Sequence, residues 1–304
     1  MRITAGLGSV ESFERYVEAG VDEVFCGWEP FEWRRKYGVI SPINRREVLL
    51  YPVQIGALAD MKLLARLSER HRVPVAVAFN STCYAPGQYA EIISMIETLM
   101  DIGVTRFILA DPALMLRLRE RNSTAQIHMS GEFGELNSRV SFAREIGTAR
   151  IIFHRKISPG EMAALVHANP GMEFEAFALN ERCFYTGAFC QSLHCDEMPH
   201  LCRVPNRLGG VERKVNKTDD APDAPDADDL GASGCGLCAL QSLSEAGVTH
   251  LKLVGRGNSP ARMARDIRAL RDALAMIDRP DYAAEMKHAL FPNGCANACY
   301  YAVQ

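Results

Sequence analysis

The sequence predicts an α/β fold of the TIM-barrel type, in which eight parallel strands alternate with helices. A glycine that ends a helix recurs before apolar runs, as in EAGV at 18–21 and 245–248, DIGV at 101–104 and EIGT at 145–148. The runs that follow are short and nearly continuous in apolar residues, which suits strands covered on both faces. Eight such units in about 280 residues match the usual size of a (β/α)8 barrel.

The elements follow one another along the chain. We expect strands at residue 3 and at 24–26, 75–79, 107–110, 127–129, 151–153, 174–178 and 251–254. Helical periodicity predicts helices at 9–20, 59–71, 88–103, 112–121, 135–147, 159–167 and 260–277, with a further helix near Leu240. The alternative is a doubly wound open sheet, but no GxGxxG motif follows the first strand, which counts against its dinucleotide-binding form.

We expect a single domain over residues 1–304, interrupted by one long insertion after the seventh strand. Roughly sixty residues separate the end of that strand near Leu179 from the helix near Leu240, where a βα loop usually has about 2 to 6. Residues 181–238 are rich in cysteine, and 219–229 form an acidic linker of Pro, Ala and Asp that should be solvated. The insertion leaves the end of the barrel where enzymes of this fold place their chemistry.

Composition narrows the classes of function. Lys and Arg number 34 against 37 Asp and Glu, a formal charge of −3, so a broad nucleic-acid-binding surface is disfavoured. We expect a cytoplasmic protein, because the first residues lack a signal-peptide pattern and no apolar run has the length of a membrane span. In a reducing compartment, the ten cysteines point to metal binding or reactivity rather than to disulfides.

Six cysteines belong to the insertion: Cys183, Cys190, Cys195, Cys202, Cys235 and Cys238. Thiolates select iron–sulfur clusters, zinc or copper(I), and four of them hold a [4Fe–4S] cluster or a structural zinc ion. Zinc ribbons use two tight pairs, whereas six residues lie between the first two cysteines here and only the last pair is tight. The spacing therefore favours a cluster, with zinc as the alternative.

The remaining four cysteines carry a weaker signal. Cys26 and Cys83 lie in or beside expected strands, where a cysteine usually packs as a small apolar side chain. Cys295 and Cys299 form a pair close to the end of the chain. A second metal site, a redox pair and a coincidental helix face remain open for them.

Several segments together resemble the U32 family. Residues 127–130 (IHMS), Asn137 and 146–152 (IGTARII) resemble its segment IHxST…N…LGxxRIVLxRE. Glu175, Cys183 and Cys190 have the spacing of its ExFVHGAxC…SGxC signature. Two further segments match: 202–203 resembles its CR step, and 237–256 resembles LCAI…EAGVxSLKIEGR.

The resemblance implies an oxygen-independent hydroxylase that carries a [4Fe–4S] cluster. Carried over by position, the cluster ligands are Cys183, Cys190, Cys202 and Cys238, with Cys195 as the alternative for the third place, and Cys235 has no ligand role. The expected substrate is a small aromatic molecule, and the oxygen donor is a carboxylated compound such as prephenate. A heterodimer with a related U32 protein is a further expectation, and a nucleic-acid substrate is disfavoured by the charge.

Candidate catalytic residues follow the strands at the expected mouth of the barrel. We select Glu132, Glu175 and Arg256. Arg256 is a candidate to bind a carboxylated donor, as are Arg155 and Lys156 after the sixth strand. Glu175 also fits a second role, because its position before the strand end would let it pair with a cation inside the barrel. Other polar candidates near this face are Asn80, Asp111, His128, His154 and His194.

Two other functions remain as alternatives. A cysteine peptidase needs a Cys–His pair oriented by Asn or Asp, and the sequence neighbours His194 and Cys195 do not by themselves create that geometry. A non-catalytic protein could carry the cluster as a redox sensor or as the silent subunit of a heterodimer.

Overall fold

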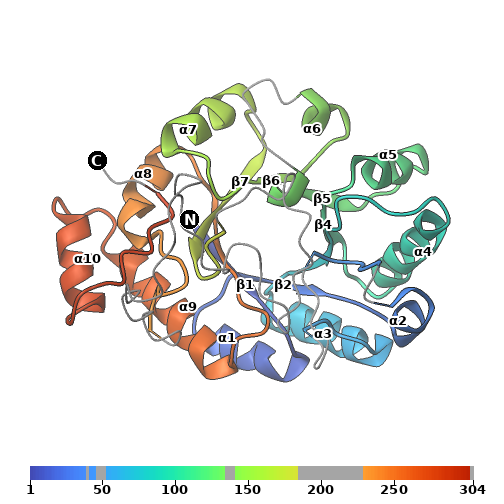
Figure 1. The fold of residues 1–304 in the computed structure, drawn as a ribbon, viewed down its shortest axis with the longest axis horizontal. Coiled ribbons are helices and arrows are strands. Elements are labelled where there is room, and N and C mark those ends of the chain that lie inside the picture. Colours follow the sequence, from blue (N-terminus) through green and yellow to red (C-terminus); the bar gives the residue numbers. More distant parts are fainter. Residues whose placement is uncertain (39–40, 46–52, 134–140, 184–228, 302–304) are drawn as a thin grey trace, which may run out of the picture.

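The computed structural model describes residues 1–38, 41–45, 53–133, 141–183 and 229–301. Eight parallel strands form a closed barrel in the order β1 to β8, and helices surround it (Figure 1). The TIM-barrel prediction is therefore confirmed. None of the helices in these ranges is long and apolar enough to cross a membrane.

The barrel and its helices have the following bounds. The strands are β1 Arg2–Gly6, β2 Glu23–Gly27, β3 Val75–Phe79, β4 Arg106–Leu109, β5 Gln126–Met129, β6 Arg150–Ile152, β7 Glu173–Leu179 and β8 His250–Leu253. The helices are α1 Phe13–Glu18, α2 Phe31–Tyr37, α3 Leu58–His71, α4 Gln88–Asp101, α5 Pro112–Glu120, α6 Ser141–Glu145, α7 Pro159–Ala168, α8 Leu240–Glu245, α9 Pro260–Ala275 and α10 Tyr282–Leu290. Three short 3-10 helices are Val10–Ser12, Gly131–Phe133 (η2) and Leu237–Ala239 (η5).

All eight expected strands are present, together with two helices, α2 and α10, that the sequence pattern did not predict. Helix α2 has only seven residues, too few for a periodic pattern to stand out, and α10 lies beyond the last barrel element. The expected helix at 135–147 is described as α6 from residue 141. Most of the Cys-rich insertion, including 219–228 of the acidic linker, lies outside the described residues.

Local capping explains where several helices begin. Ser158 and Glu161 form a reciprocal capping box at the start of α7, with proline at its first position. Asp111 caps α5 by accepting a hydrogen bond of 2.8 Å from the backbone N–H of Ala113. Asp111 is therefore the N-cap residue of α5, and its carboxylate also accepts a hydrogen bond from the Tyr89 hydroxyl.

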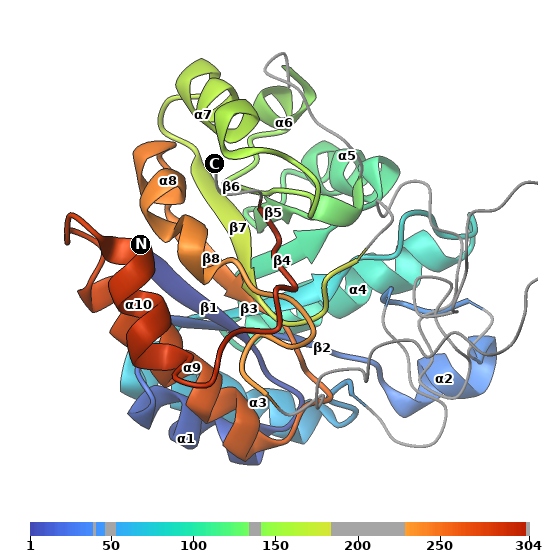
Figure 2. The same ribbon diagram turned by 60° about the vertical axis from the view of Figure 1, so that its left-hand side comes forward.

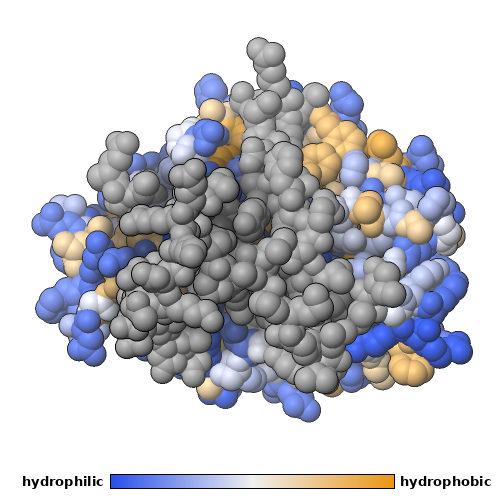
Figure 3. Space-filling view, in the orientation of Figure 1, coloured by the Kyte–Doolittle hydropathy of each residue, from blue (hydrophilic) through white to orange (hydrophobic). Residues whose placement is uncertain are grey.

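The two faces of the barrel differ sharply in polarity. Strand residues that face the helices, such as Val24, Val77 and Leu251, are apolar and fully buried. Cys26 shares this face, where burial raises the pKa of its thiol to about 12, as expected for a packing role. The exterior of the helices is mainly hydrophilic (Figure 3), with a few exposed apolar side chains such as Phe31.

Strand register identifies the residues of the barrel interior. Side chains alternate between the two faces of a strand, and paired residues share a face. Thr4 pairs with Glu23, and Glu175 pairs with His250, so these side chains belong to the same interior face. The lower interior is consequently charged, in contrast to the branched apolar residues that usually fill such barrels.

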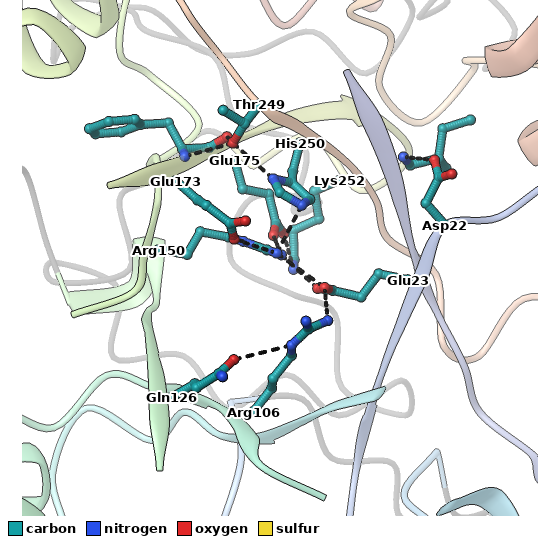
Figure 4. Close-up of polar contacts among 12 residues, drawn as sticks. Asp22, Glu23, Arg106, Gln126, Arg150, Glu173, Glu175, Thr249, His250 and Lys252 are labelled. Atoms are coloured by element: carbon teal, nitrogen blue, oxygen red, sulfur yellow. Dashed lines mark hydrogen bonds and ion pairs between the residues drawn. The ribbon is translucent and has the colours of Figure 1, made fainter. Parts of the chain in front are cut away.

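A network of buried charges occupies this interior (Figure 4). The guanidinium of Arg150, whose side chain is 1% exposed, donates hydrogen bonds of 2.6 Å to Glu23, 2.8 Å to Glu175 and 2.9 Å to Glu173. Glu175 also accepts a hydrogen bond of 2.6 Å from the Lys252 ammonium. Burial alone would raise the pKa of Glu175, but Lys252 and Arg150 lower it to about 2.

Two histidines of the barrel interior are neutral, and one of them, His250, contacts the network. Nε2 of His250 lies 2.9 Å from Nη2 of Arg150, and burial lowers the pKa of His250 to about 4. Burial, reinforced by Arg150, also lowers the pKa of His128 well below its ordinary value. His128 is therefore a neutral side chain of the barrel interior.

The first prediction concerns Glu175→Gln. At pH 7 the variant should lose roughly 3–5 kcal/mol of stability, because Arg150 and Lys252 lose a buried counter-charge. In the wild-type protein, Glu175 ionises near pH 2 when folded and near 4.5 when unfolded, so its contribution of about 3 kcal/mol is present above pH 5 and declines as the pH falls toward 2. Chemical denaturation of both proteins between pH 7 and 2 should show the stability gap narrowing as the pH decreases.

The exposed Glu32, which pairs with Arg35 on α2, provides the control. Glu32→Gln should change stability little at any pH in this range, because exposed ion pairs contribute little. A gap between wild type and Glu175→Gln that stays constant with pH would contradict the assigned ionisation.

Candidate functional site

The carboxyl ends of the strands surround a cavity of about 120 Å³. Its floor is one layer of interior side chains from alternate strands: Phe25, Ile108, Ile152 and Lys252. Residues after the strands form its walls, among them Asn80, Ser130, Gly131, Glu132, Arg155, Cys183 and Arg256. The cavity lies where enzymes of this fold bind their substrates.

Glu132 is held between two arginines. Its carboxylate lies 3.4 Å from Nη1 of Arg155 and 3.6 Å from Nε of Arg45. The Arg155 guanidinium also stacks on the Phe177 ring at 4.0 Å. Burial disfavours the charge on Arg155, yet the acidic groups around it, among them Glu132, leave its pKa above the ordinary value. Glu132 thus stays fixed at the wall of the cavity, beside two cations.

Arg256 approaches the cavity from the segment after β8. Its Nη1 donates a hydrogen bond of 2.7 Å to Oε1 of Gln54. Gly27 makes room for this pair, because a Cβ atom there would lie 1.6 Å from that oxygen and 2.5 Å from Nη1 of Arg256. The absence of a side chain at Gly27 in β2 therefore leaves the space that the Arg256 guanidinium occupies.

Lys252 also lines the cavity, although it was not among the residues predicted for the site. Its ammonium lies 3.8 Å from the centre of the Phe25 ring and bonds Glu175 below the floor. Burial lowers the pKa of Lys252, although Glu175 opposes that effect. The signal for it was the alternation of His250 and Lys252 with Leu251 and Leu253, which places both polar residues on the interior face.

The structure brings some of the expected site residues together and separates others. Glu132, Arg155, Arg256, Asn80 and Cys183 line the cavity. Glu175 lies below the floor, where it pairs with Arg150 and Lys252, which confirms the second role expected for it. The residues that line the cavity in the described ranges include neither Lys156 nor any histidine.

The expected cluster ligands also differ in their position relative to the cavity. Of the four expected cluster ligands, Cys183 lines the cavity, and Cys238 lies in η5 and is not among the described lining residues. Cys190, Cys195 and Cys202, together with His194, lie outside the described residues. Within the described ranges, no group of three or more His, Cys, Asp or Glu side chains is arranged to hold a metal ion.

Comparison with known proteins identifies the family. The model of peptidase family U32 matches residues 8–294. The chain belongs to peptidase family U32. The solved structure of the U32 peptidase Mk0906 has the same fold, with a TM-score of 0.51 and 11% identity over 86% of this chain and 94% of that chain.

Two curated relatives have a higher sequence identity to this chain than the solved structure does. Both are named tRNA hydroxylation protein P, one from Haemophilus influenzae and one from Escherichia coli. Each is 29% identical to this U32 protein over 94 residues, or 30% of the chain. The matched segment spans only 20% of the first relative and 21% of the second.

The second prediction tests the cavity as an anion site. A small dicarboxylate such as malonate should raise the melting temperature of the wild-type protein, because a ligand that binds only the folded state stabilises it. Arg155→Gln should weaken this binding about tenfold, since it removes a charge-assisted hydrogen-bond donor.

The exposed Arg35 on α2 offers a matched control, because Arg35→Gln removes the same charge from the surface. A melting-temperature rise of equal size in Arg35→Gln and Arg155→Gln, over a full malonate titration, would show that malonate binds elsewhere.

Proposed function

We propose that this U32 protein catalyses an oxygen-independent hydroxylation of a small aromatic substrate, with a carboxylated oxygen donor such as prephenate. The observation that carries the proposal is the cavity at the barrel mouth, where Arg155, Arg256 and Lys252 converge beside Glu132 and Cys183. Guanidinium and ammonium groups bind carboxylates through charge-assisted hydrogen bonds. The names of the two curated relatives support hydroxylation as the class of reaction.

The size of the cavity favours a small molecule. Its volume of about 120 Å³ is close to that of an engineered cavity of about 150 Å³ that accepts one benzene molecule. The chain also has a formal charge of −3, which gives little general attraction for a polynucleotide. These properties support a compact aromatic or carboxylated ligand over an RNA strand, although the relatives are named for tRNA.

The residues around the cavity have separable tasks in this proposal. Arg155 and Arg256 would bind the carboxylates of the donor, and Lys252 would approach the ligand from the floor. Glu132, placed beside Arg155 and Arg45, would accept or return a proton at its carboxylate. Phe25 and Phe177 provide apolar surface against which an aromatic ring packs.

A [4Fe–4S] cluster is the cofactor in this proposal, with zinc as the alternative. Cys183 fits it, because this residue lines the cavity four residues after the end of β7. Cys190, Cys202 and Cys238 complete the set implied by the family resemblance, and Cys195 is the alternative ligand. When bound, a cluster with all four irons held by thiolates would supply electron transfer.

One observation disfavours the peptidase alternative. Cysteine proteases activate the nucleophile with a histidine within hydrogen-bond reach. Cys183 lines the cavity, but none of the described lining residues is a histidine. A non-catalytic subunit or a redox sensor would carry the same cluster but would not convert a substrate. An activity assay therefore distinguishes that role from catalysis.

The third prediction tests the cluster. Protein purified without oxygen should contain iron and sulfide and absorb in the visible range, and Cys183→Ser should lose most of this iron because a thiolate ligand is missing. Cys83→Ser serves as control, since Cys83 is exposed and lies outside the set. Wild-type protein that contains zinc and no sulfide would contradict the cluster.

The fourth prediction concerns turnover. Prephenate labelled with 18O and a panel of small aromatic acids should give a product that carries the labelled oxygen, detected by mass spectrometry. Lys252→Met and Arg256→Gln should each lower kcat/KM about 100-fold, as removal of one electrostatic stabiliser typically does.

Arg35→Gln should leave kcat/KM unchanged, because Arg35 lies on the exposed face of α2. Label found only in tRNA, with none in the small acids, would contradict the proposed substrate class. No labelled product from either class would favour the non-catalytic role.

A further inference from the structure

Gln54, the hydrogen-bond partner of Arg256, is almost fully buried, with 3% of its surface exposed. Helix α2, which follows β2, lies at the edge of the molecule (Figure 2), and the chain is beside β2 again at Ile55. The backbone N–H of Ile55 donates to the carbonyl of Gly27 at 2.9 Å, and the N–H of Glu29 donates to the carbonyl of Ile55 at 2.9 Å. These two hydrogen bonds tie the backbone next to Gln54 to the end of β2.

A chain of buried amides fixes the side chain of Gln54. Asn44, which is fully buried, accepts a hydrogen bond of 3.1 Å from the backbone N–H of Asn80, directly after β3. The Asn44 amide donates to Oε1 of Gln54 at 3.4 Å, and the same oxygen accepts from Nη1 of Arg256 at 2.7 Å. Since a backbone N–H and a guanidinium can only donate, the two ends of the chain determine which way each amide is turned. Gln54 therefore presents its oxygen to Arg256.

The backbone of Arg256 is fixed as closely as its side chain. A Cβ atom on Gly8 would lie 2.0 Å from the carbonyl oxygen of Arg256, so only glycine lets the chain after β1 pass this close. Arg256 lines the cavity, whereas Gln54 is not among the lining residues that the structure describes. A ligand in the cavity thus contacts Arg256, and Gln54 acts on that ligand through the guanidinium.

We propose that Gln54 is a positioning residue that aims Arg256 at a carboxylate of the ligand through a neutral hydrogen bond. A carboxylate acceptor would orient the guanidinium equally well, but it would also pair with the charge of the guanidinium. Lys252, by contrast, is held by the carboxylate of Glu175. The amide of Gln54 fixes the direction of Arg256 and removes no charge from it.

Position 54 is then a determinant of ligand charge. An anionic ligand gains a charge-assisted hydrogen bond from Arg256, which an uncharged ligand of the same size does not. Malonate should therefore raise the melting temperature of the wild-type protein, and malonamide should not. The inference rests on the proposed function in one respect, that Arg256 binds a carboxylate.

Two substitutions distinguish positioning from a merely structural role. Gln54→Glu keeps an acceptor for Arg256 and Asn44 and adds a competing charge, whereas Gln54→Leu removes the acceptor and adds no charge. Malonate affinity, measured by melting-temperature titrations of the whole protein, should fall at least about tenfold in Gln54→Glu and about threefold in Gln54→Leu. Melting temperatures without malonate should have the opposite order, because only Gln54→Leu takes the acceptor from two buried donors.

Gln126→Glu is the matched control. Gln126 is an exposed residue at the start of β5 and accepts a hydrogen bond of 3.3 Å from Nε of Arg106, so the variant makes the same change beside an arginine outside the cavity. It should leave malonate affinity unchanged. Equal malonate affinities in Gln54→Glu and Gln126→Glu, or weaker binding in Gln54→Leu than in Gln54→Glu, would overturn the proposal.

Two further outcomes separate this proposal from the proposed reaction. Malonamide that binds as tightly as malonate, or wild-type protein that binds neither, would also overturn the positioning role. Loss of malonate affinity in Gln54→Glu, in a protein whose wild type forms no labelled product from prephenate, would support the positioning role and contradict only the reaction.

Discussion

The buried guanidinium of Arg150 is the constraint around which the barrel interior is organised. A cation that is 1% exposed is tolerated only with paired counter-charges and satisfied hydrogen-bond donors. The chain supplies Glu23 from β2 and Glu173 and Glu175 from β7, so three strands must adopt one register for the charge to be compensated. A slip of one residue in any of them would turn the partner carboxylate toward the helices.

This constraint extends to the cavity through Glu175. One of its oxygens faces Arg150 and the other faces Lys252, so a single carboxylate joins the lower ionic layer to the cavity floor. The network thereby fixes the ammonium of Lys252 without a flexible loop. Buried charges usually reduce the stability of a fold. Here they hold the Lys252 ammonium at the cavity floor, where a ligand can contact it.

The sequence allowed the barrel to be predicted because its signals are local. Short apolar strands, and the glycines that end helices, can be recognised within a single βα unit. All eight strands lie where they were expected. The charged interior was harder to foresee, because the strands were interpreted as apolar on both faces. The alternation of His250 and Lys252 with leucines held that information, but which face points inward depends on closure of the whole barrel.

In the candidate site, too, residues could be predicted from their place after a strand, whereas contacts between distant strands could not. Glu132 and Arg256 could be predicted because each lies three residues after a strand, and strand ends converge in any barrel of this kind. Glu175 also was selected, but its true neighbours come from β6 and β8, so only the closed structure separates it from the cavity. The pairing of Cys235 with Cys299 joins residues about sixty apart in sequence and had no signal in the sequence.

The exit of β7 is where these features converge. Asn180 has φ of 69°, a left-handed conformation that costs about 1–3 kcal/mol in a residue other than glycine unless its surroundings impose it. Here they do: its side chain bonds the buried Asp266 at 2.9 Å, its N–H bonds Gly234 at 2.8 Å, and its carbonyl accepts from Tyr300. Helix α9, the end of the insertion and the C-terminal segment therefore each hold one group of the same turn. Since Cys183 follows three residues later, the position of the first loop thiol at the cavity is set by contacts from all three elements.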